Sequence, residues 1–358
     1  MDGCDLNSES KYLINIVVPC YNCQETLDST VNSLIKQQIP KDCIEVQIIL
    51  VDDGSTDRTS TICDNYSSKY QNILVIHKEN GGLVDAWKTG VRSAQGQYIA
   101  FCDSDDYIDK NFVKTISQTI IQFKPELIVF GMTFEYDNGD IIHEDVLLKS
   151  GYYDRTQIVN ELFPVLLSNG DMQTELLQSS RCNKVFAKSL LDKILDDIPE
   201  NVSFGEDDIT CFAAELNTNS IYCIHGYYPY HYVRNTSSMI GTYDVDVFIK
   251  IEKLYKALKK ISEKYRFNYP EQVDKDILSI LFVCLKKEIC KNPNGLKSVL
   301  KRLNCVHDSE AFVCCYDKET IRNYGISKRL FALLFYKKWF VCIYIISRIY
   351  EGIRGRNV

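Results

Sequence analysis

The chain has 358 residues and a formal net charge of −7 at pH 7, with 45% hydrophobic and 25% charged residues. This length has room for one full domain and an extension. The acidic balance, with no stripe of Lys and Arg across the first 240 residues, argues against a nucleic-acid-binding protein.

Apolar runs alternate with helical patterns through the first hundred residues. The runs predict strands, and the segments between them carry apolar residues at helical spacing, such as Leu27 and Leu34. Gly54 indicates a turn, and Ser55 or Thr56 caps the helix after it. This rhythm predicts a mostly parallel, right-handed α/β sheet flanked by helices. The expected strands are 13–18, 46–51, 73–77 and 98–102, and the expected helices are 25–38, one that ends at 66 and one that ends at 94.

Several of these strands end in polar or acidic loops. Asp103, Asp105 and Asp106 follow the last strand within four positions, and such carboxylates cost stability unless a cation or a hydrogen-bond network compensates them. Mg²⁺ and Mn²⁺ are typically held by one or two carboxylates and the oxygens of a substrate diphosphate. Since open α/β sheets bind ligands at the carboxyl ends of their strands, this cluster is a candidate metal–nucleotide site. The alternative is an acidic turn that caps the next helix.

Five short motifs occur in a consistent order. They are Val-Val-Pro-Cys-Tyr-Asn-Cys-Gln-Glu at 17–25, Val-Asp-Asp-Gly-Ser-Thr-Asp at 51–57, Asn-Gly-Gly at 80–82, Asp-Ser-Asp-Asp-Tyr-Ile at 103–108 and Phe-Gly-Glu-Asp-Asp at 204–208. Together they resemble the family-2 glycosyltransferases of bacterial surface and capsular polysaccharide synthesis, over roughly residues 13–240. The resemblance implies the GT-A fold, which is a Rossmann-like, mostly parallel sheet flanked by helices, and sugar transfer from a nucleotide-sugar.

The resemblance assigns many of the motif residues to the nucleotide. Tyr21 would lie against a pyrimidine ring, and Asp53 would accept a hydrogen bond from the ring N–H of uracil. Asp52 is expected to order its turn, whereas Glu25 either supports the loop or is a carboxylate in the first turn of the helix. The implied nucleotide-binding residues are Pro19, Tyr21, Asn22, Glu25, Asp53, Asn80, Gly81 and Asp103.

The resemblance also implies a divalent cation, Mn²⁺ or Mg²⁺. It assigns Asp105 to the metal, and Asp103 to the ribose or to the surroundings of the same metal. The cation would neutralise the charge that grows on the departing diphosphate. Asp106 has two interpretations, a role in the site or the N-cap of a helix over 110–121.

Asp207 is the residue that we expect to act as general base, because the base of the resembled family is the aspartate after the glutamate. A carboxylate opposite the diphosphate can take the proton of the acceptor hydroxyl, and such direct displacement inverts the anomeric configuration. Glu206 and Asp208 are competing assignments. The alternative is that these acids only stabilise the N-terminus of a helix over 209–216, which leaves Gly205 unexplained.

Residues 86–88 depart from the family pattern, and a later segment supplies further candidate site residues. The family often has Ala-Arg-Asn at 86–88, where this chain has Ala-Trp-Lys; either Lys88 replaces a lost charge or Trp87 packs in the core. His231 and Arg234, with Glu206, are candidates for contacts to the diphosphate or the acceptor. The alternative for His231 and Arg234 is a packed edge strand with a solvated arginine.

The sequence changes to helical patterns beyond about residue 241, with expected helices over 245–265, 272–290 and 294–303. The tail, 328–358, has apolar runs that Lys337 and Lys338 interrupt, so neither reaches the roughly 20 residues of a spanning helix. It carries seven Lys and Arg against one acid, a net charge of +6. Aromatic, aliphatic and basic residues together predict a helix that lies in an anionic membrane surface, and packing onto the catalytic domain or a partner is the alternative.

We therefore expect a GT-A domain over residues 1–240 and a helical region with a basic tail over residues 241–358. The predicted function is metal-dependent, inverting transfer from a UDP-sugar to a glycan or lipid-linked acceptor at the inner face of the cell membrane. A non-catalytic partner subunit would be expected to lose the acids, and a sugar nucleotidyltransferase would have a Gly-rich phosphate loop followed by Lys near 19–22. The fifteen cysteines are scattered, Cys20 and Cys23 have no second pair at zinc-ribbon spacing, and the N-terminus has no basic-then-apolar signal, so we expect reduced thiols in a cytoplasmic protein.

Overall fold

The computed structural model describes residues 12–40, 44–167, 175–234, 243–322 and 324–354. The chain divides into two compact units. The first consists of Met1–Asn160 and Leu177–Thr236, and the second of Glu161–Leu176 and Ser237–Val358. The second unit thus takes in a short segment from the middle of the sequence.

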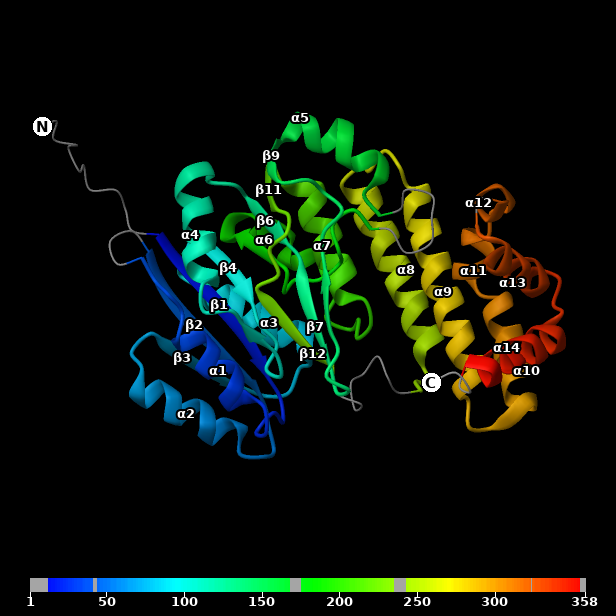
Figure 1. Cartoon of the computed structure of the whole chain (residues 1–358), viewed down its shortest axis with the longest axis horizontal. Helices are drawn as coiled ribbons and strands as arrows, with labels where there is room; N and C mark the ends of the chain where they lie inside the picture. The colour runs from blue at the N-terminus through cyan, green and yellow to red at the C-terminus, as the bar shows by residue number, and fades with distance from the viewer. Residues whose placement is uncertain (1–11, 41–43, 168–174, 235–242, 323, 355–358) are drawn as a thin grey trace, which may run out of the picture. The chain divides into compact units, whose positions relative to one another are not determined.

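The first unit is built on an eight-stranded sheet in the order β3-β2-β1-β4-β10-β6-β11-β9 (Figure 1). Strands β1 to β4 pair in parallel, as predicted, whereas β10 is antiparallel to both of its neighbours and β9 is antiparallel to β11. The strands are β1 (Tyr12–Cys20), β2 (Ile44–Asp53), β3 (Ile73–Lys78), β4 (Tyr98–Phe101), β6 (Leu127–Phe130), β9 (Gly151–Asp154), β10 (Lys184–Ala187) and β11 (Ser220–Ile224).

Helices cover this sheet, and its central strands are almost entirely apolar. Ile16 and Val17 of β1 and Ile48 of β2 are completely buried, as expected for strands whose two faces are both covered. The helices and helical turns of this unit are α1 (Leu27–Ile35), α2 (Thr59–Lys69), α3 (Leu83–Ser93), α4 (Phe112–Phe123), α5 (Arg155–Gln157), η1 (Ile158–Leu162, which runs into the second unit), α6 (Lys188–Ile194), η3 (Leu195–Asp197) and α7 (Glu206–Asn217).

The strand order reverses between β1 and β4. Right-handed crossovers put α1 and α2 on one face of the sheet and α3 on the other. The register brings the strand ends together: Cys20 pairs with Asp52, and the amide of Cys102 donates to the carbonyl of Val17 at 3.0 Å. The carboxyl ends of β1, β2 and β4 therefore meet at a topological switch point, where open α/β sheets bind ligands.

A second, four-stranded sheet in the order β5-β12-β7-β8 completes the first unit. Its strands are β5 (Tyr107–Ile108), β7 (Met132–Tyr136), β8 (Ile141–Glu144) and β12 (Tyr230–Arg234). Because β12 pairs with both β5 and β7, it lies inside the sheet, and the edge-strand interpretation of this segment was wrong.

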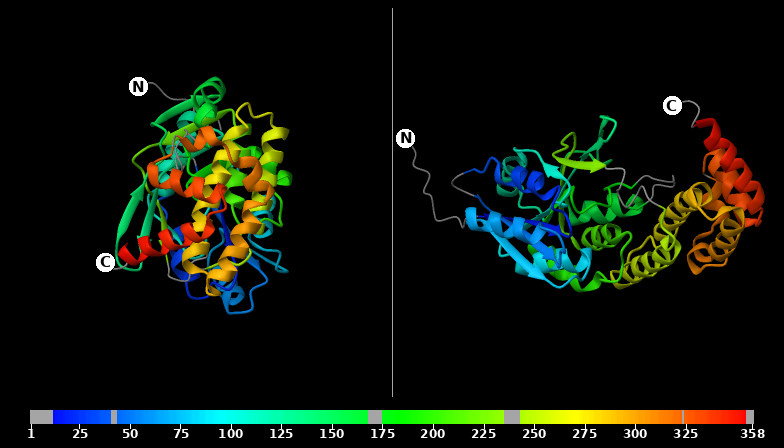
Figure 2. Two further views of the ribbon diagram at one scale, coloured as in Figure 1. Left: turned by 90° about the vertical axis from the view of Figure 1, so that its right-hand side faces the viewer. Right: turned by 90° about the horizontal axis from the view of Figure 1, so that it is seen from below.

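The second unit is helical. Helices α8 and α9 pack side by side (Figure 2), and they bury Leu254, Leu258, Ile277 and Leu281. None of the helices that the structure describes combines the length and the apolar composition that crossing a bilayer requires. The helices are η2 (Phe163–Val165), α8 (Val247–Lys264), α9 (Glu271–Lys291), α10 (Gly295–His307), α11 (Glu310–Cys315), α12 (Lys318–Arg322), α13 (Ile326–Tyr336) and α14 (Phe340–Arg354).

Candidate functional site

Three loops at the switch point carry most of the predicted site residues. Tyr21 follows β1, Asp53 ends β2, and Asp103 and Asp105 follow β4. These positions are distant in sequence, and the parallel pairing of β1 with β2 and β4 brings them to one edge of the sheet. The structure thus brings the motifs that follow these three strands to one edge of the sheet.

The loop after β1 carries an exposed aromatic ring and is hydrogen-bonded to the loop after β2. Tyr21 is 53% exposed, which leaves its ring available to a ligand. Asn22, in the left-handed region at φ 48°, donates its amide N–H to Ser55 Oγ at 3.1 Å and accepts the N–H of Thr56 at 2.8 Å. Glu25 is exposed and precedes α1, so its interpretation as a first-turn helix carboxylate was wrong.

Asp53 is buried, at 3% exposure, and most of its hydrogen-bonding capacity is used. Its Oδ1 accepts the amide of Gly81 at 2.9 Å and Lys78 Nζ at 2.6 Å, and its Oδ2 accepts the amide of Gly82 at 2.8 Å. Lys78 also pairs with Asp85 at 2.6 Å. Each carboxylate oxygen has two lone pairs, so Oδ2 retains one acceptor position for a ligand N–H.

The remaining polar groups of these loops hold the backbone. Asn80 donates its side-chain amide to the carbonyl of Asp53 at 3.0 Å, and Asp52 accepts the amide of Ser55 at 3.1 Å and the hydroxyl of Ser60 at 2.5 Å. Burial works to raise the pKa of Asp52, but hydrogen bonds from Ser55, Ser60 and His77 outweigh it and lower the pKa. The prediction that Asp52 orders its turn is confirmed.

The acidic loop after β4 holds carboxyl groups with raised pKa values. Burial raises the pKa of Asp103 to about 7; Arg181 opposes this rise, while the negative charges of Asp207 and Asp105 add to it. Partial desolvation also raises the pKa of Asp105. A region that disfavours negative charge to this extent would gain from a bound cation.

Asp106 has a structural partner in the second sheet. It is 1% exposed and accepts the hydroxyl of Tyr230 at 2.6 Å and the amide of Val233 at 2.8 Å. Burial raises its pKa to about 8. The N-cap interpretation was wrong, because α4 begins only at Phe112, with Asn111 before it. Asp106 instead joins the acidic loop to β12.

The residues of this loop fit a divalent cation that is shared with a substrate. Asp103 and Asp105 offer carboxylate oxygens, which Mg²⁺ and Mn²⁺ prefer. In the part of the chain that the structure describes, no three His, Cys, Asp or Glu side chains are arranged to hold a metal ion by themselves. A cation would therefore take its other ligands from a diphosphate and water, as Mg²⁺ commonly does.

Acidic residues open α7 beside a buried arginine. Gly205 has φ 73°, a conformation that favours glycine, which explains the residue that the helix-terminus alternative left unexplained. Asp207 Oδ1 lies 2.5 Å from Arg181 Nε, and Glu206 Oε1 lies 3.8 Å from Arg181 Nη2. Burial, and then the charge of Asp207, raises the pKa of Glu206, while Arg181 lowers it. Asp208 lies in the same first turn.

Arg181 and Lys78 are the residues that sequence reasoning missed. Arg181 is 2% exposed and stands in a polar run just before β10, where a sequence pattern indicates only an exposed loop. Lys78 ends an apolar strand, and its contact with Asp53 depends on the pairing of β2 with β3. No local signal distinguishes either residue from an ordinary surface cation.

Trp87 packs in the core, as one of the two interpretations of its segment proposed. It is completely buried and meets Phe101 edge-on at 5.8 Å. Lys88 is also buried, and its Nζ donates to the carbonyl of Ile198 at 2.6 Å. Its partners thus belong to the segment before α7, where it also lies 3.4 Å from Glu200.

The two candidates on β12 have different surroundings. His231 stacks on Tyr107 at 4.3 Å, and its ring nitrogens lie 2.9 Å from Glu135 and 3.3 Å from Asp109. Both nitrogens are therefore engaged.

Arg234 is enclosed by aromatic rings. Its guanidinium carbon lies 5.0 to 5.8 Å from the ring centres of Phe134, Tyr136 and Tyr232, and its Nε is buried without a hydrogen-bond partner among the described residues. Burial, together with the negative charges of residues 103, 105 and 106, raises the pKa of Tyr232 to about 12. Arg234 therefore belongs to a strand within the electrostatic reach of the acidic loop.

Residues 15–173 match the family model described as glycosyl transferase family 2. Glycosyltransferase GlyA of Streptococcus pneumoniae is 28% identical over 230 residues, which are 64% of this chain and 32% of GlyA. Poly(ribitol-phosphate) beta-N-acetylglucosaminyltransferase TarS of Staphylococcus aureus is 24% identical over 263 residues, which are 73% of this chain and 42% of TarS. The chain thus spans less than half the length of these relatives.

The crystal structure of residues 1–349 of S. aureus TarS in complex with UDP-GlcNAc aligns with a TM-score of 0.67 at 20% sequence identity. The alignment covers 95% of this chain and 91% of the TarS chain. The fold is accordingly the GT-A fold with a C-terminal helical region, as the sequence predicted.

Proposed function

Because residues 15–173 match the model of glycosyl transferase family 2, we propose that the chain moves a sugar from a nucleotide-sugar, in particular a UDP-sugar, to a hydroxyl of a glycan or lipid-linked acceptor. One observation supports this proposal: carboxylates suited to recognise a base, to bind a metal and to accept a proton belong to one unit, the first three at strand ends that meet at the switch point and the last within electrostatic reach of Asp103. These groups are Asp53, Asp103 with Asp105, and Asp207. Sugar transfer needs all three functions.

The nucleotide base is proposed to lie on Tyr21, between the loops after β1 and β2. The remaining acceptor position of Asp53 Oδ2 suits the ring N–H of uracil, while the amides of Gly81 and Gly82 and the Lys78 ammonium fix the carboxylate. Pro19, Asn22 and Asn80 shape the same loops, and Glu25 supports them from the surface.

Asp105, with Asp103, would hold Mn²⁺ or Mg²⁺ on the diphosphate, although Asp103 alternatively contacts the ribose. When bound, the cation supplies Lewis-acid neutralisation of the leaving diphosphate. His231 and Arg234 are further candidates for the diphosphate or the acceptor. The guanidinium of Arg234, with a buried Nε that lacks a partner among the described residues, suits a phosphate oxygen better than His231, whose nitrogens are engaged.

Asp207 is proposed as the general base that takes the proton of the acceptor hydroxyl. Its side chain is 28% exposed, so a hydroxyl can reach it. With the base on one side of the sugar and the diphosphate on the other, direct displacement would invert the anomeric configuration. Glu206 and Asp208 remain the competing assignments.

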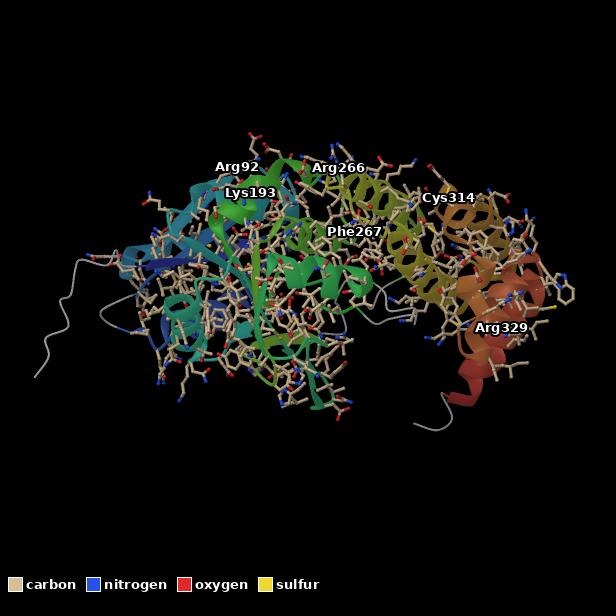
Figure 3. All side chains as sticks on the ribbon, turned by 90° about the horizontal axis from the view of Figure 1, so that it is seen from above. Arg92, Lys193, Arg266, Phe267, Cys314 and Arg329 are labelled. Carbon is tan, nitrogen blue, oxygen red and sulfur yellow. The ribbon has the colours of Figure 1, made fainter. Side chains whose placement is uncertain are left out.

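The acceptor is proposed to be a cell-surface polymer or its lipid-linked precursor. Two relatives, a Bacillus spizizenii glucosyltransferase and TarS, are named for poly(ribitol-phosphate), which makes a polyol-phosphate polymer one candidate. The exposed apolar and basic residues of α13 and α14, among them Arg329 (Figure 3), support a peripheral place on the inner face of the cell membrane.

Release of UDP from a panel of UDP-sugars in the presence of Mn²⁺ tests the proposal. We expect turnover of at least one donor, and Asp207→Asn should retain UDP binding while losing about 10²-fold or more in turnover. The exposed Asp196 gives a matched control, Asp196→Asn, which should leave turnover unchanged. No turnover of any nucleotide-sugar would favour a non-catalytic partner subunit, and a fully active Asp207→Asn would move the base to Glu206 or Asp208.

A further inference from the structure

We propose that Arg181 is a positioning residue that holds the base Asp207 in its working orientation. This inference rests on the proposed function and deepens it, since it names a residue that no sequence motif marks. The geometry is direct: Arg181 Nε lies 2.5 Å from Asp207 Oδ1, and the arginine is 2% exposed. Because Arg181 is buried, it would act on the reaction through Asp207 and not by contact with the substrate.

Aromatic side chains fix the guanidinium. Its carbon lies 5.0 Å from the ring centre of Trp87 and 5.5 Å from that of Phe101, within the range of cation–π contact. Its Nε and Nη1 are both buried without a hydrogen-bond partner among the described residues, so Nε meets Asp207 Oδ1 as a close ion pair and not in hydrogen-bond geometry. The ring faces, which attract cations, account for a buried N–H without an oxygen acceptor, and they leave the guanidinium few alternative positions.

The backbone of Arg181 is tied to the strand that precedes the metal-binding loop. The amide of Lys184 donates to the carbonyl of Arg181 at 3.2 Å, and β10, which follows, pairs with β4 through Val185 and Ala100. Strand β4 leads directly to Asp103 and Asp105. Arg181 therefore relates the base on α7 to the acidic loop through the main sheet.

The position of the base needs this support. Asp207 stands in the first turn of α7, directly after the left-handed turn at Gly205, and an unsupported aspartate there has several rotamers. A general base works only within hydrogen-bond reach of the proton that it takes, and small displacements reduce the rate strongly. The neighbouring Glu206 repels the Asp207 carboxylate, and Arg181 attracts both.

A double-mutant cycle separates this role from a structural one. Removal of one partner from a buried ion pair generally destabilises a protein, so stability alone cannot decide. We compare Arg181→Met, Arg181→Lys, Asp207→Asn and the double variants, measuring UDP release from the UDP-sugar that the wild type turns over fastest. Calorimetry with UDP and thermal unfolding report on binding and folding.

Arg181→Met should lower kcat by about 10- to 100-fold with UDP affinity retained, and Arg181→Lys should recover part of this loss. When Asp207 is already replaced by Asn, Arg181→Met should lower kcat by less than about 3-fold further. The base through which Arg181 acts is then missing. Lys184→Met, which removes another fully buried cation, is the matched control and should combine additively with Asp207→Asn. Among the described residues, Lys184 Nζ donates to the carbonyls of Leu177, Gln178 and Ser180 and to Asn183.

Three outcomes would overturn the inference or its premise. Multiplicative losses for Arg181→Met and Asp207→Asn would mean that Arg181 does not act through the base. A folded Arg181→Lys protein with wild-type kcat, where Arg181→Met fails to fold, would assign Arg181 to stability alone. An inactive wild type that still binds UDP would count against the proposed transfer reaction itself, and the positioning role would fall with it.

Discussion

At the scale of single residues, the surroundings of the buried Asp53 carboxylate suit the base-recognition role proposed for it. Three donors from the protein hold it, which fixes its orientation and leaves one lone pair of Oδ2 for a ring N–H. A buried acceptor with one open position disfavours a base that lacks the matching donor, because the carboxylate would then remain incompletely solvated. Uracil has such an N–H.

Lys78→Met should weaken UDP binding by about tenfold, because Asp53 loses its ion pair and Asp85 loses its partner nearby. Isothermal calorimetry with UDP measures this change. Lys110→Met, at an exposed lysine before α4, is the control that should leave the affinity unchanged. Equal affinity of the Lys78 variant and the wild type would show that Lys78 does not position Asp53.

Cys23 should react with iodoacetamide at neutral pH. A hydrogen bond from Cys20 lowers the pKa of Cys23 to about 7. Burial of the thiol raises this pKa, and hydrogen bonds from Ser104 and Thr59 lower it further. The reactive thiolate therefore forms as pH rises through 7, so labelling should rise between about pH 6 and 8 and then level off, while ordinary thiols with a pKa near 8.5 continue to gain. Peptide mass spectrometry distinguishes Cys23 from the exposed Cys305 and Cys342.

UDP should slow this labelling, because Cys23 lies in the same loop as Tyr21 and is only 8% exposed, so a base bound on Tyr21 would restrict access to the thiol. A labelling profile that keeps rising beyond pH 9 would contradict the lowered pKa. Labelling that is unaffected by UDP would contradict the proposed base site.

Candidate site positions could be named from the sequence where a motif is local. Asp53, Asp103, Asp105 and Asp207 stand within short motifs, and their neighbours in sequence already indicate their chemistry. Arg181 lies 26 positions before Asp207, and its function depends on a contact that only the folded chain makes. A sequence pattern contains no information on which buried cation will face which acid.

At the scale of elements, the nucleotide loops depend on close backbone approach. Gly54 has φ 69°, and a Cβ added there would lie 2.7 Å from the amide nitrogen of Asn80. The loop after β2 can therefore touch the loop after β3 only if residue 54 has no side chain. Gly139 in the β7–β8 hairpin has a similar φ of 86°, but a Cβ there would meet nothing within 4 Å.

Gly54→Ala should lower the free energy of unfolding by about 2–4 kcal/mol, combining a left-handed conformation with a steric clash. Gly139→Ala should lower the free energy of unfolding by about 1 kcal/mol, because it adds the left-handed conformation of alanine without a steric clash. Chemical denaturation measures both values, and calorimetry should show weaker UDP binding for Gly54→Ala alone. An equal decrease in the free energy of unfolding for the two variants would mean that the loops after β2 and β3 can move apart without loss of stability.

The elements that the sequence predicted are those with strong local patterns. The four parallel strands at the N-terminus and the long helices α8 and α9 match the expected ranges within a few residues. The second sheet was not predicted, since β5 has only two residues and pairs with β12, more than a hundred positions away. Strand β10, inserted antiparallel between β4 and β6, likewise depends on long-range pairing.

At the scale of the whole molecule, the C-terminal helices have two different faces. Phe335, Phe340 and Ile343 are buried within the second unit, where α14 contacts α9 and α13. This part of the tail thus packs on helices of its own unit, a contact that neither interpretation of the tail included. Apolar residues on the other side remain exposed, namely Leu330 at 49%, Trp339 at 55%, Val341 at 48%, Ile345 at 51% and Ile349 at 58%. Packing and membrane binding are therefore compatible, because they use different residues.

Trp339→Ser combined with Ile345→Ser and Ile349→Ser should reduce binding to phosphatidylglycerol vesicles by at least about tenfold, because the apolar insertion is lost. Point substitutions are preferable to deletion of 328–358, which would also remove core residues. Ile249→Ser with Val313→Ser, at exposed positions of α8 and α11, is the matched control. Sedimentation with vesicles at low and high salt measures binding, and wild-type protein that stays in the supernatant at low salt would exclude the membrane role.

We propose that Asp103 and Asp105 complete a metal–diphosphate site next to a uracil pocket. Isothermal calorimetry of UDP binding, with and without Mn²⁺, tests it on the wild type and on Asp105→Ala. We predict that Mn²⁺ strengthens UDP binding to the wild type by at least about tenfold, and that this dependence disappears in the variant, because the diphosphate loses its counter-charge. UDP binding that is indifferent to Mn²⁺ in the wild type, or an unchanged metal dependence in Asp105→Ala, would contradict the claim.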